Sequence, residues 1–328
     1  MTGRRPLSLL LAVACAALVT ACGGTSADDT SPTAAATPGF PVTVENCGVT
    51  TTYERPPSRA VSMNQHATEA LLALGLEKSM VGTAYLDDEV LPEYKAAYDG
   101  IKVIAEEYPS YETLLTSEPD FVYGGWSSAF DEKEGRSRDR LTKAGINTHV
   151  NIEECPEGRV TLATMDEEIT TLAKIFGVPD RAKALIGKLH EPLDAVTAKL
   201  KDLDPLKVFV YDSGDKTAFT AGGAGIGTEL IKLAGGVNLF ADVDKAWADV
   251  SFEQVADRAP EVIVIYDYGS QSAADKKKFL LSNPALKDVP AIKNERFAVL
   301  PLSSTVTGVR VPAAVQSLAE QIHPDLFK

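Results

Sequence analysis

The sequence predicts an α/β fold of two similar lobes joined by a long helix. Short β-type runs alternate with helical patterns along most of the chain, which is typical of mainly parallel sheets. Two motifs occur twice in the same order, and a helical stretch separates the two copies. With 328 residues, 45% of them hydrophobic, the chain is long enough to bury the cores of two lobes.

Seven runs rich in β-branched and aromatic residues are predicted as strands. Four lie in the first half and three in the second: residues 59–63, 80–85, 120–123, 148–152, 207–211, 261–266 and 296–300. Between the halves, residues 165–200 carry apolar side chains at helical spacing, broken at Gly177-Val178-Pro179. A second helix is therefore predicted from Asp180 to Lys201, and Pro192 is expected to bend or interrupt it.

The internal repeat supports two lobes of the same build. Residues 110–122 align without gaps with residues 251–263, and each segment reads as a serine-capped helix, a proline stop and a strand. Residues 68–75 match residues 228–235 in the same way. Chance can supply one such match between amphipathic helices, but two in the same order favour a pseudo-symmetric pair.

The first 21 residues are predicted to be a signal peptide. Two arginines precede an apolar run from Leu7 to Val19, which is too short for a transmembrane helix of about 20 residues. The run ends in Val19-Thr-Ala-Cys22, which resembles a bacterial lipobox, so Cys22 is expected to carry a lipid anchor outside the cytoplasm. An ordinary signal peptide cleaved nearby is the alternative. Residues 22–41 are small, polar and proline-containing, which predicts a flexible tether.

Charge and cysteine content exclude several classes of protein. A formal charge of −14 and the lack of a basic stripe argue against a nucleic-acid partner. The cysteines lack the spacing of a structural zinc site. Beyond the predicted anchor only Cys47 and Cys155 remain, and an exported protein places them in an oxidising compartment, which favours a disulfide. Two unpaired buried thiols are the alternative.

The lack of common enzyme motifs in the sequence favours a binding protein over an enzyme. The chain contains no Gly-x-Ser-x-Gly elbow, no phosphate-binding Gly-Lys-Ser/Thr loop and no His-Glu-x-x-His pair. Residues 222–227 are rich in glycine, but they do not fit the dinucleotide-binding fingerprint and are interpreted as a tight loop at the edge of a cleft. An oxidoreductase of two nucleotide-binding lobes is the alternative from another class.

Several of these segments together resemble the substrate-binding lipoproteins of bacterial ABC importers for iron-siderophores, cobalamin and haem. The resemblance spans roughly residues 42–328. The features that carry it are the lipobox, the two repeated motifs, residues 234–240, and Trp247 just before Val250-Ser251. It implies two Rossmann-like lobes (residues 42–179 and 202–328), one rigid interlobe helix (residues 180–201), a ligand cleft between the lobes, little closure on binding, and an ABC permease as partner.

Candidate ligand-binding residues lie at the ends of predicted strands, where α/β lobes bind their ligands. The loop after the first strand contributes Asn64, Gln65 and His66. The aromatic residues at strand ends or in loops, which suit a large flat ligand, are Tyr85, Trp126, Phe219 and Trp247. Arg310 is placed to meet an anionic group of the ligand. The structural alternatives are core aromatics and a surface ion pair for the arginine.

Glu112 and Glu253 begin the two serine-capped helices of the repeat, where an acidic side chain favourably meets the helix dipole. Stability alone explains that placement. The resemblance implies a second role, because family members use one glutamate on each lobe to engage arginines of the two permease subunits.

The expected function is therefore that of a membrane-anchored, monomeric, non-enzymatic receptor that captures a ferric siderophore or similar metal chelate. The metal is expected to arrive inside the ligand, so no protein-held metal or cofactor is predicted. Cobalamin is the second candidate, and haem the third, since His66, Tyr85 or Tyr123 has the chemistry to ligate iron but no axial pair is evident.

Overall fold

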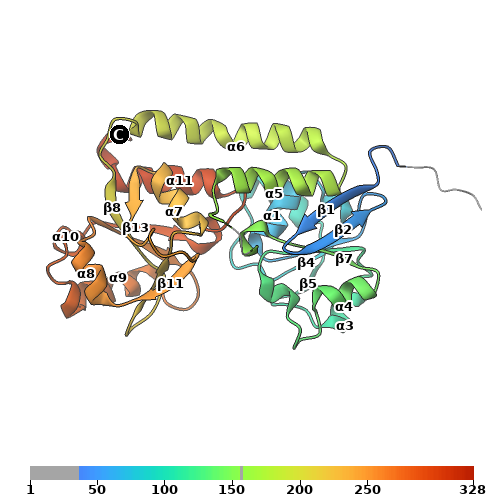
Figure 1. The fold of residues 1–328 in the computed structure, drawn as a ribbon, viewed down its shortest axis with the longest axis horizontal. Coiled ribbons are helices and arrows are strands. Elements are labelled where there is room, and N and C mark those ends of the chain that lie inside the picture. Colours follow the sequence, from blue (N-terminus) through green and yellow to red (C-terminus); the bar gives the residue numbers. More distant parts are fainter. Residues whose placement is uncertain (1–36, 156–157) are drawn as a thin grey trace, which may run out of the picture. The chain divides into compact units, whose positions relative to one another are not determined.

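The computed structural model describes residues 37–155 and 158–328. A parallel sheet of five strands forms the centre of the first lobe (Figure 1). The strand order is β5-β4-β3-β6-β7. The strands are β3 (Ala60–Met63), β4 (Met80–Ala84), β5 (Val103–Ala105), β6 (Phe121–Gly124) and β7 (Asn147–Val150). An antiparallel hairpin, β1 (Val42–Asn46) and β2 (Val49–Tyr53), precedes them.

Five α-helices belong to this lobe: α1 (Gln65–Ala73), α2 (Pro92–Tyr98), α3 (Tyr111–Leu115), α4 (Arg138–Lys143) and α5 (Leu162–Ile175). Short 3-10 turns η1 (Glu77–Ser79), η2 (Ser127–Phe130) and η3 (Ile152–Glu154) complete it. All four strands predicted here are present, with ends within two residues of the prediction.

The second lobe repeats this design with a four-stranded parallel sheet of order β10-β8-β12-β13. Its strands are β8 (Leu206–Tyr211), β10 (Gly236–Asn238), β12 (Val262–Asp267) and β13 (Phe297–Pro301), and an antiparallel pair is formed by β9 (Ala218–Ala221) and β11 (Trp247–Val250). The helices are α7 (Ile226–Leu233), α8 (Phe252–Arg258), α9 (Ala273–Ser282), α10 (Pro290–Lys293) and α11 (Val311–Ile322), with 3-10 turns η4 (Pro284–Leu286), η5 (Leu302–Ser304) and η6 (Pro324–Leu326).

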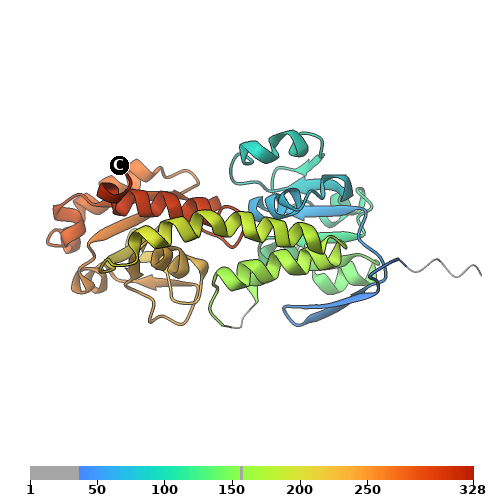
Figure 2. The ribbon, with the colours of Figure 1, turned by 90° about the horizontal axis from the view of Figure 1, so that it is seen from above.

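Helix α6 (Pro179–Leu200) connects the lobes and packs against α5 of the first lobe and α11 of the second (Figures 1 and 2). Its buried side chains join one hydrophobic core that includes residues of both sheets. The expected interruption at Pro192 is wrong, because the helix continues through this residue. Pro192 has no N–H to donate to the carbonyl of Lys188, and Lys188 lies on the exposed face of the helix, so this missing hydrogen bond is not buried in the core.

The repeat found in the sequence corresponds to equivalent elements of the two lobes. Ser110 caps α3 and Ser251 caps α8, and in each lobe a central strand follows, β6 or β12. The predicted signal peptide and Cys22 lie outside the described residues. At the described end of the predicted tether, the half-buried Phe40 already packs against the core.

Candidate functional site

The carboxyl ends of strands from both lobes border a cavity of about 710 Å³. This is the place where α/β sheets bind ligands, because the loops that follow parallel strands meet there. The first lobe contributes most of the lining and the second contributes two residues. The lining residues are Asn64, Tyr85, Asp87, Glu107, Tyr108, Trp126, Ser128, Asp131, Glu134, Arg136, Tyr268 and Leu302.

Tyr85 and Tyr108 form an aromatic wall on the first lobe. Their rings meet edge to face, with centroids 4.5 Å apart and planes at 90°. The Tyr108 hydroxyl donates to Asn64 Oδ1 at 3.0 Å and lies 3.0 Å from Ser128 Oγ. Burial raises the pKa of Tyr108, so the side chain of Tyr108 is a neutral phenol at neutral pH.

Backbone conformation fixes where two of these residues point. Asn64 adopts a φ of 80° directly after β3, and Tyr85 adopts a φ of 55° directly after β4. With a ψ of 155°, Asn64 lies in a region that is almost restricted to glycine, and a positive φ is strained for a bulky residue such as Tyr85 as well. Strain of this kind persists where the surrounding structure holds it, and it is common at ligand sites.

Trp126 and Tyr268 come from opposite lobes. Trp126 follows β6, and its ring meets the His66 imidazole edge-on at 5.3 Å. Tyr268 follows β12, is 37% exposed, and its hydroxyl donates to Asp212 Oδ1 at 2.5 Å. Burial and the neighbouring Asp212 raise the pKa of Tyr268 to about 12. The cavity therefore has neutral aromatic side chains on both lobes.

Three of the predicted ligand residues, Asn64, Tyr85 and Trp126, line this cavity. The expected loop at Gln65 and His66 is wrong, because both belong to the first turn of α1 and are buried. His66 Nε2 donates to the Gly125 carbonyl at 3.0 Å, and burial lowers its pKa despite that bond and nearby carboxylates. His66 therefore supports the cavity from behind, through Trp126.

Phe219 and Trp247 do not line this cavity. They lie on β9 and β11, which pair in register, and their rings stack with centroids 5.4 Å apart and planes at 12°. Trp247 also meets Tyr266 edge-on at 5.9 Å. The prediction that Trp247 is a loop residue is wrong, and this pair has the contacts of a lobe-packing aromatic cluster.

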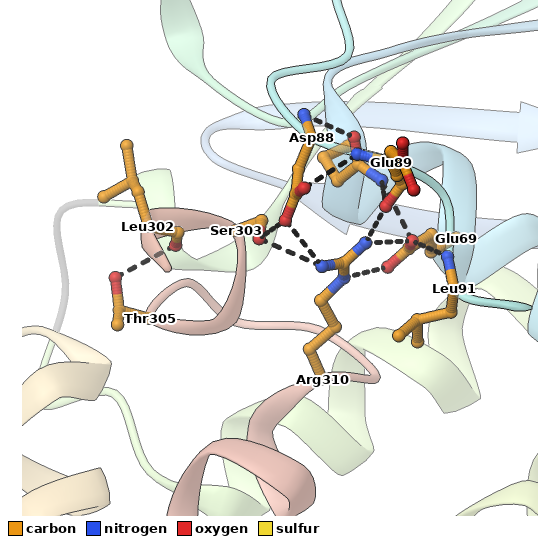
Figure 3. A network of polar contacts seen from close by, with 9 residues as sticks. Glu69, Asp88, Glu89, Leu91, Leu302, Ser303, Thr305 and Arg310 are labelled. Carbon is orange, nitrogen blue, oxygen red and sulfur yellow. Dashed lines mark hydrogen bonds and ion pairs between the residues drawn. The ribbon is translucent and has the colours of Figure 1, made fainter. Parts of the chain in front are cut away.

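Arg310 is likewise not placed to meet a ligand, since the surrounding protein occupies all of its donors (Figure 3). It donates from Nε and Nη2 to the two Glu69 oxygens at 2.7 Å each, and from Nη1 to Asp88 at 2.9 Å. Nη1 and Nη2 also donate to Ser303 Oγ and to the Glu89 carbonyl. The residue is a buried tie between α11 and the first lobe rather than a surface ion pair.

Burial lowers the pKa of Arg310, but the hydrogen bonds and charges of Glu69 and Asp88 raise it by a larger amount. The pKa of Arg310 therefore lies above its usual range.

A second tie lies nearby. Glu153 of the first lobe accepts from the backbone N–H of Thr307 at 2.7 Å and of Ile226 at 3.2 Å. The start of α7, which follows the glycine-rich segment, thus already holds a carboxylate of the same chain.

Glu112 and Glu253 are exposed in the first turns of α3 and α8, at equivalent positions of the two lobes. In Figure 1 both helices lie on the side of the lobes away from α6.

The Cys47 and Cys155 Sγ atoms are 2.01 Å apart, so the structure contains the expected disulfide, which joins the β1–β2 turn to the segment after η3. No helix among the described residues is long and apolar enough to span a membrane.

Sequence reasoning missed several lining residues, Tyr108 and Tyr268 among them. Tyr268 lies two residues beyond the predicted strand 261–266, so the rule that selected Tyr85 would have selected it as well. Tyr108 follows β5, a strand of three residues that the sequence pattern did not predict.

Two pseudo-symmetric α/β lobes, one connecting helix and an aromatic cavity between them define a two-lobed solute-binding protein. Residues 61–303 match the family described as Periplasmic binding protein. This match spans more than half of the chain, which therefore belongs to that family.

Two relatives show what kinds of protein the chain is similar to. The ABC transporter substrate-binding lipoprotein YvrC of Bacillus subtilis, whose function is uncharacterized, is 24% identical over 326 residues, covering 98% of this chain and 97% of the relative. A vitamin B12-binding protein of Vibrio parahaemolyticus is 26% identical over 217 residues, covering 65% and 72%. The resemblance to ABC importer substrate-binding proteins is thereby confirmed.

Solved structures agree with this assignment. A periplasmic binding protein from Veillonella parvula is 34% identical with a TM-score of 0.79, covering 86% of this chain and 97% of that one. A protein of an ABC-type Fe3+-hydroxamate transport system from Saccharomonospora viridis is 27% identical with a TM-score of 0.71, covering 88% and 99%. The predicted two-lobed α/β fold is confirmed.

Proposed function

We propose that this protein is an extracytoplasmic lipoprotein that captures a ferric siderophore and delivers it to an ABC permease. The observation that carries the proposal is the cavity of about 710 Å³ with Tyr85, Tyr108 and Trp126 on one lobe and Tyr268 on the other. Aromatic walls on rigid elements provide the apolar contact that a bulky chelate needs. The similarity to the hydroxamate-transport protein of Saccharomonospora viridis supports the same ligand class.

Cobalamin is the second candidate, and a specific observation favours it. The relatives include vitamin B12-binding proteins, and an aromatic-walled cavity suits a corrin as well as a siderophore. The metal is part of the ligand in both cases, so the proposal needs no metal or cofactor held by the protein.

The ligand class is tested by titrating the purified protein, without its signal peptide, with a ferric trihydroxamate, cyanocobalamin and haem in a calorimeter, because a calorimetric signal does not depend on the two tryptophans of the chain. Trp126→Ala should weaken binding of the true ligand by about 30-fold, because truncating an aromatic anchor costs roughly 2 kcal/mol. Trp247→Ala is the matched control and should leave the affinity nearly unchanged, since Trp247 stacks on Phe219 outside the cavity. Equal losses in both variants would contradict the assignment of this cavity.

Docking to the permease is proposed for Glu112 and Glu253, because two equivalent lobes present two equivalent acids to a two-subunit partner. The double variant Glu112→Gln/Glu253→Gln should keep its affinity for the ligand but lose uptake relative to wild type, most strongly at low ionic strength, where the wild-type charges are least screened. Asp139→Asn/Asp275→Asn is the matched control, since these exposed acids also begin serine-capped helices, one in each lobe. Normal uptake by the glutamate variant at equal protein levels would leave both glutamates a purely structural role.

The lipid anchor is proposed at Cys22, where the sequence resembles a lipobox. Cys22→Ser should release the protein from the membrane fraction of expressing cells, and an unchanged distribution would contradict the anchor.

A further inference from the structure

The cavity carries four acidic side chains that have no cationic partner. Asp87 follows β4, Glu107 follows β5, and Asp131 and Glu134 follow η2, and all four line the cavity. Within the described ranges 37–155 and 158–328, none of the four forms an ion pair with a lysine, arginine or histidine. The charges of these carboxylates therefore act on whatever enters the cavity.

Among the described residues that line the cavity, Arg136 is the one with a cationic side chain. It is buried, and its donors are partly used inside the first lobe, from Nε to the Ala129 carbonyl at 3.2 Å and from Nη1 to the Pro109 carbonyl at 3.1 Å. Its guanidinium also lies over the Tyr108 ring, 5.4 Å from the centroid. One guanidinium against four carboxylates leaves the cavity with a net negative charge.

The carboxylates do not form a metal site of their own. Among the residues that the structure describes, no group of three or more His, Cys, Asp or Glu side chains is placed to hold a metal ion. The aromatic walls form the binding surface, and the acidic side chains set the electrostatic potential around it.

We infer that this cavity selects chelates of zero or positive net charge and rejects anionic ones. The inference rests on the proposed function and narrows its ligand class. Three hydroxamates neutralise Fe³⁺, and an amine tail makes the complex cationic, whereas three catecholates leave the complex strongly anionic and haem carries two propionates. Like charges facing each other across a site disfavour the wrong ligand, so the cavity favours the hydroxamate type.

The test uses three ferric complexes that share one trihydroxamate core and differ in charge at the terminal amine: ferrioxamine B, which has a terminal ammonium group, its neutral N-acetyl derivative and its anionic N-succinyl derivative. We expect the ammonium and acetyl forms to bind at least about ten-fold more tightly than the succinyl form at low salt. The difference should shrink as the ionic strength rises, because salt screens exposed charges.

Two matched variants assign this effect to the cavity. Glu107→Gln/Glu134→Gln removes two lining charges and should reduce the preference to about three-fold or less. Glu106→Gln/Glu132→Gln changes the net charge by the same amount at exposed neighbours outside the lining, and should leave the preference intact. All four positions are exposed, so each variant is expected to fold.

The outcomes separate this inference from the proposed function. Equal binding of the three complexes, or an equal effect of both double variants, would overturn the charge selection and leave the ligand class standing. Tighter binding of the succinyl form would overturn it as well. If none of the three complexes binds but a ferric tris-catecholate does, the charge selection is wrong and the proposed function stands. If neither kind of ferric siderophore binds, the proposed ligand class is wrong and the inference falls with it.

Discussion

Replacing Arg310 by methionine should destabilise the protein strongly, because it leaves a buried carboxylate without its counter-charge. The Glu69 side chain is 0% exposed and that of Arg310 is 9% exposed. Removing one partner of a buried ion pair costs about 3–5 kcal/mol. Glu69 Oε1 would keep two donors, Gln65 Nε2 at 2.9 Å and the Leu91 N–H at 3.0 Å, so we expect about 3 kcal/mol, the lower end of that range.

Urea unfolding followed by circular dichroism measures this loss, with the m-value checked for a single cooperative transition. In a thermal scan the same loss lowers Tm by roughly 5–10 °C for a chain of this size. Lys95→Met is the matched control, because it removes one positive charge from an exposed i,i+4 pair with Asp99, where about 0–1 kcal/mol is expected.

The double variant Glu69→Met/Arg310→Met separates the unpaired charge from lost packing. It should recover part of the stability that Arg310→Met loses, because no buried charge remains unpaired. If Arg310→Met is no less stable than Lys95→Met, the buried tie does not stabilise the lobes in the way proposed. The same follows if the double variant loses as much stability as the single variants Glu69→Met and Arg310→Met lose together.

Three further results are expected. Protein that begins after Cys22 should show no free thiol when denatured without reductant, and Cys47→Ser/Cys155→Ser should lose about 2–5 kcal/mol of stability, since the bond closes a loop across 108 positions. The free energy of unfolding should fall as the pH drops below about 6.5. Burial lowers the pKa of His66 and of His323, so these side chains bind protons at a higher pH in the unfolded chain than in the folded protein. A free energy of unfolding that stays constant between pH 5 and 7 would contradict this prediction. Gly125→Ala should cost about 1–3 kcal/mol in a urea titration, because its Cβ would lie 2.5 Å from the buried His66 ring, whereas a wild-type midpoint would show that the ring moves freely.

The fold was predictable because its signals are local. Each of the seven predicted strands is a short apolar run with clear boundaries, and the repeated serine caps marked equivalent helices in the two halves. Four of the missed strands lack such signals, whereas β1 and β2 are rich in β-branched residues and were overlooked just after the predicted tether. β5 and β10 have only three residues each and lie at sheet edges, and β9 and β11 form a separate antiparallel pair.

The site was only partly predictable because it depends on long-range partners. Helix α1 starts at Gln65 without a side-chain cap and without an acidic residue in its first turn, so nothing in the sequence marked the start. The partner of Arg310 is 241 positions away, and a sequence pattern does not say which carboxylate an arginine meets. Tyr85 and Trp126 were predicted because they lie at or just past the ends of predicted strands, a position that the chain order alone defines.

The ties between the lobes bear on how the ligand is recognised. Helix α6, the core shared by both lobes and the contacts of Arg310 and Glu153 all join the two halves. A cavity joined in this way keeps its aromatic walls and carboxylates at nearly fixed positions before the ligand arrives. Little binding free energy is then needed to order the site, which favours affinity. A rigid site also cannot move its charges away from an unsuitable ligand, so the shape and the net charge of the chelate must already match the cavity.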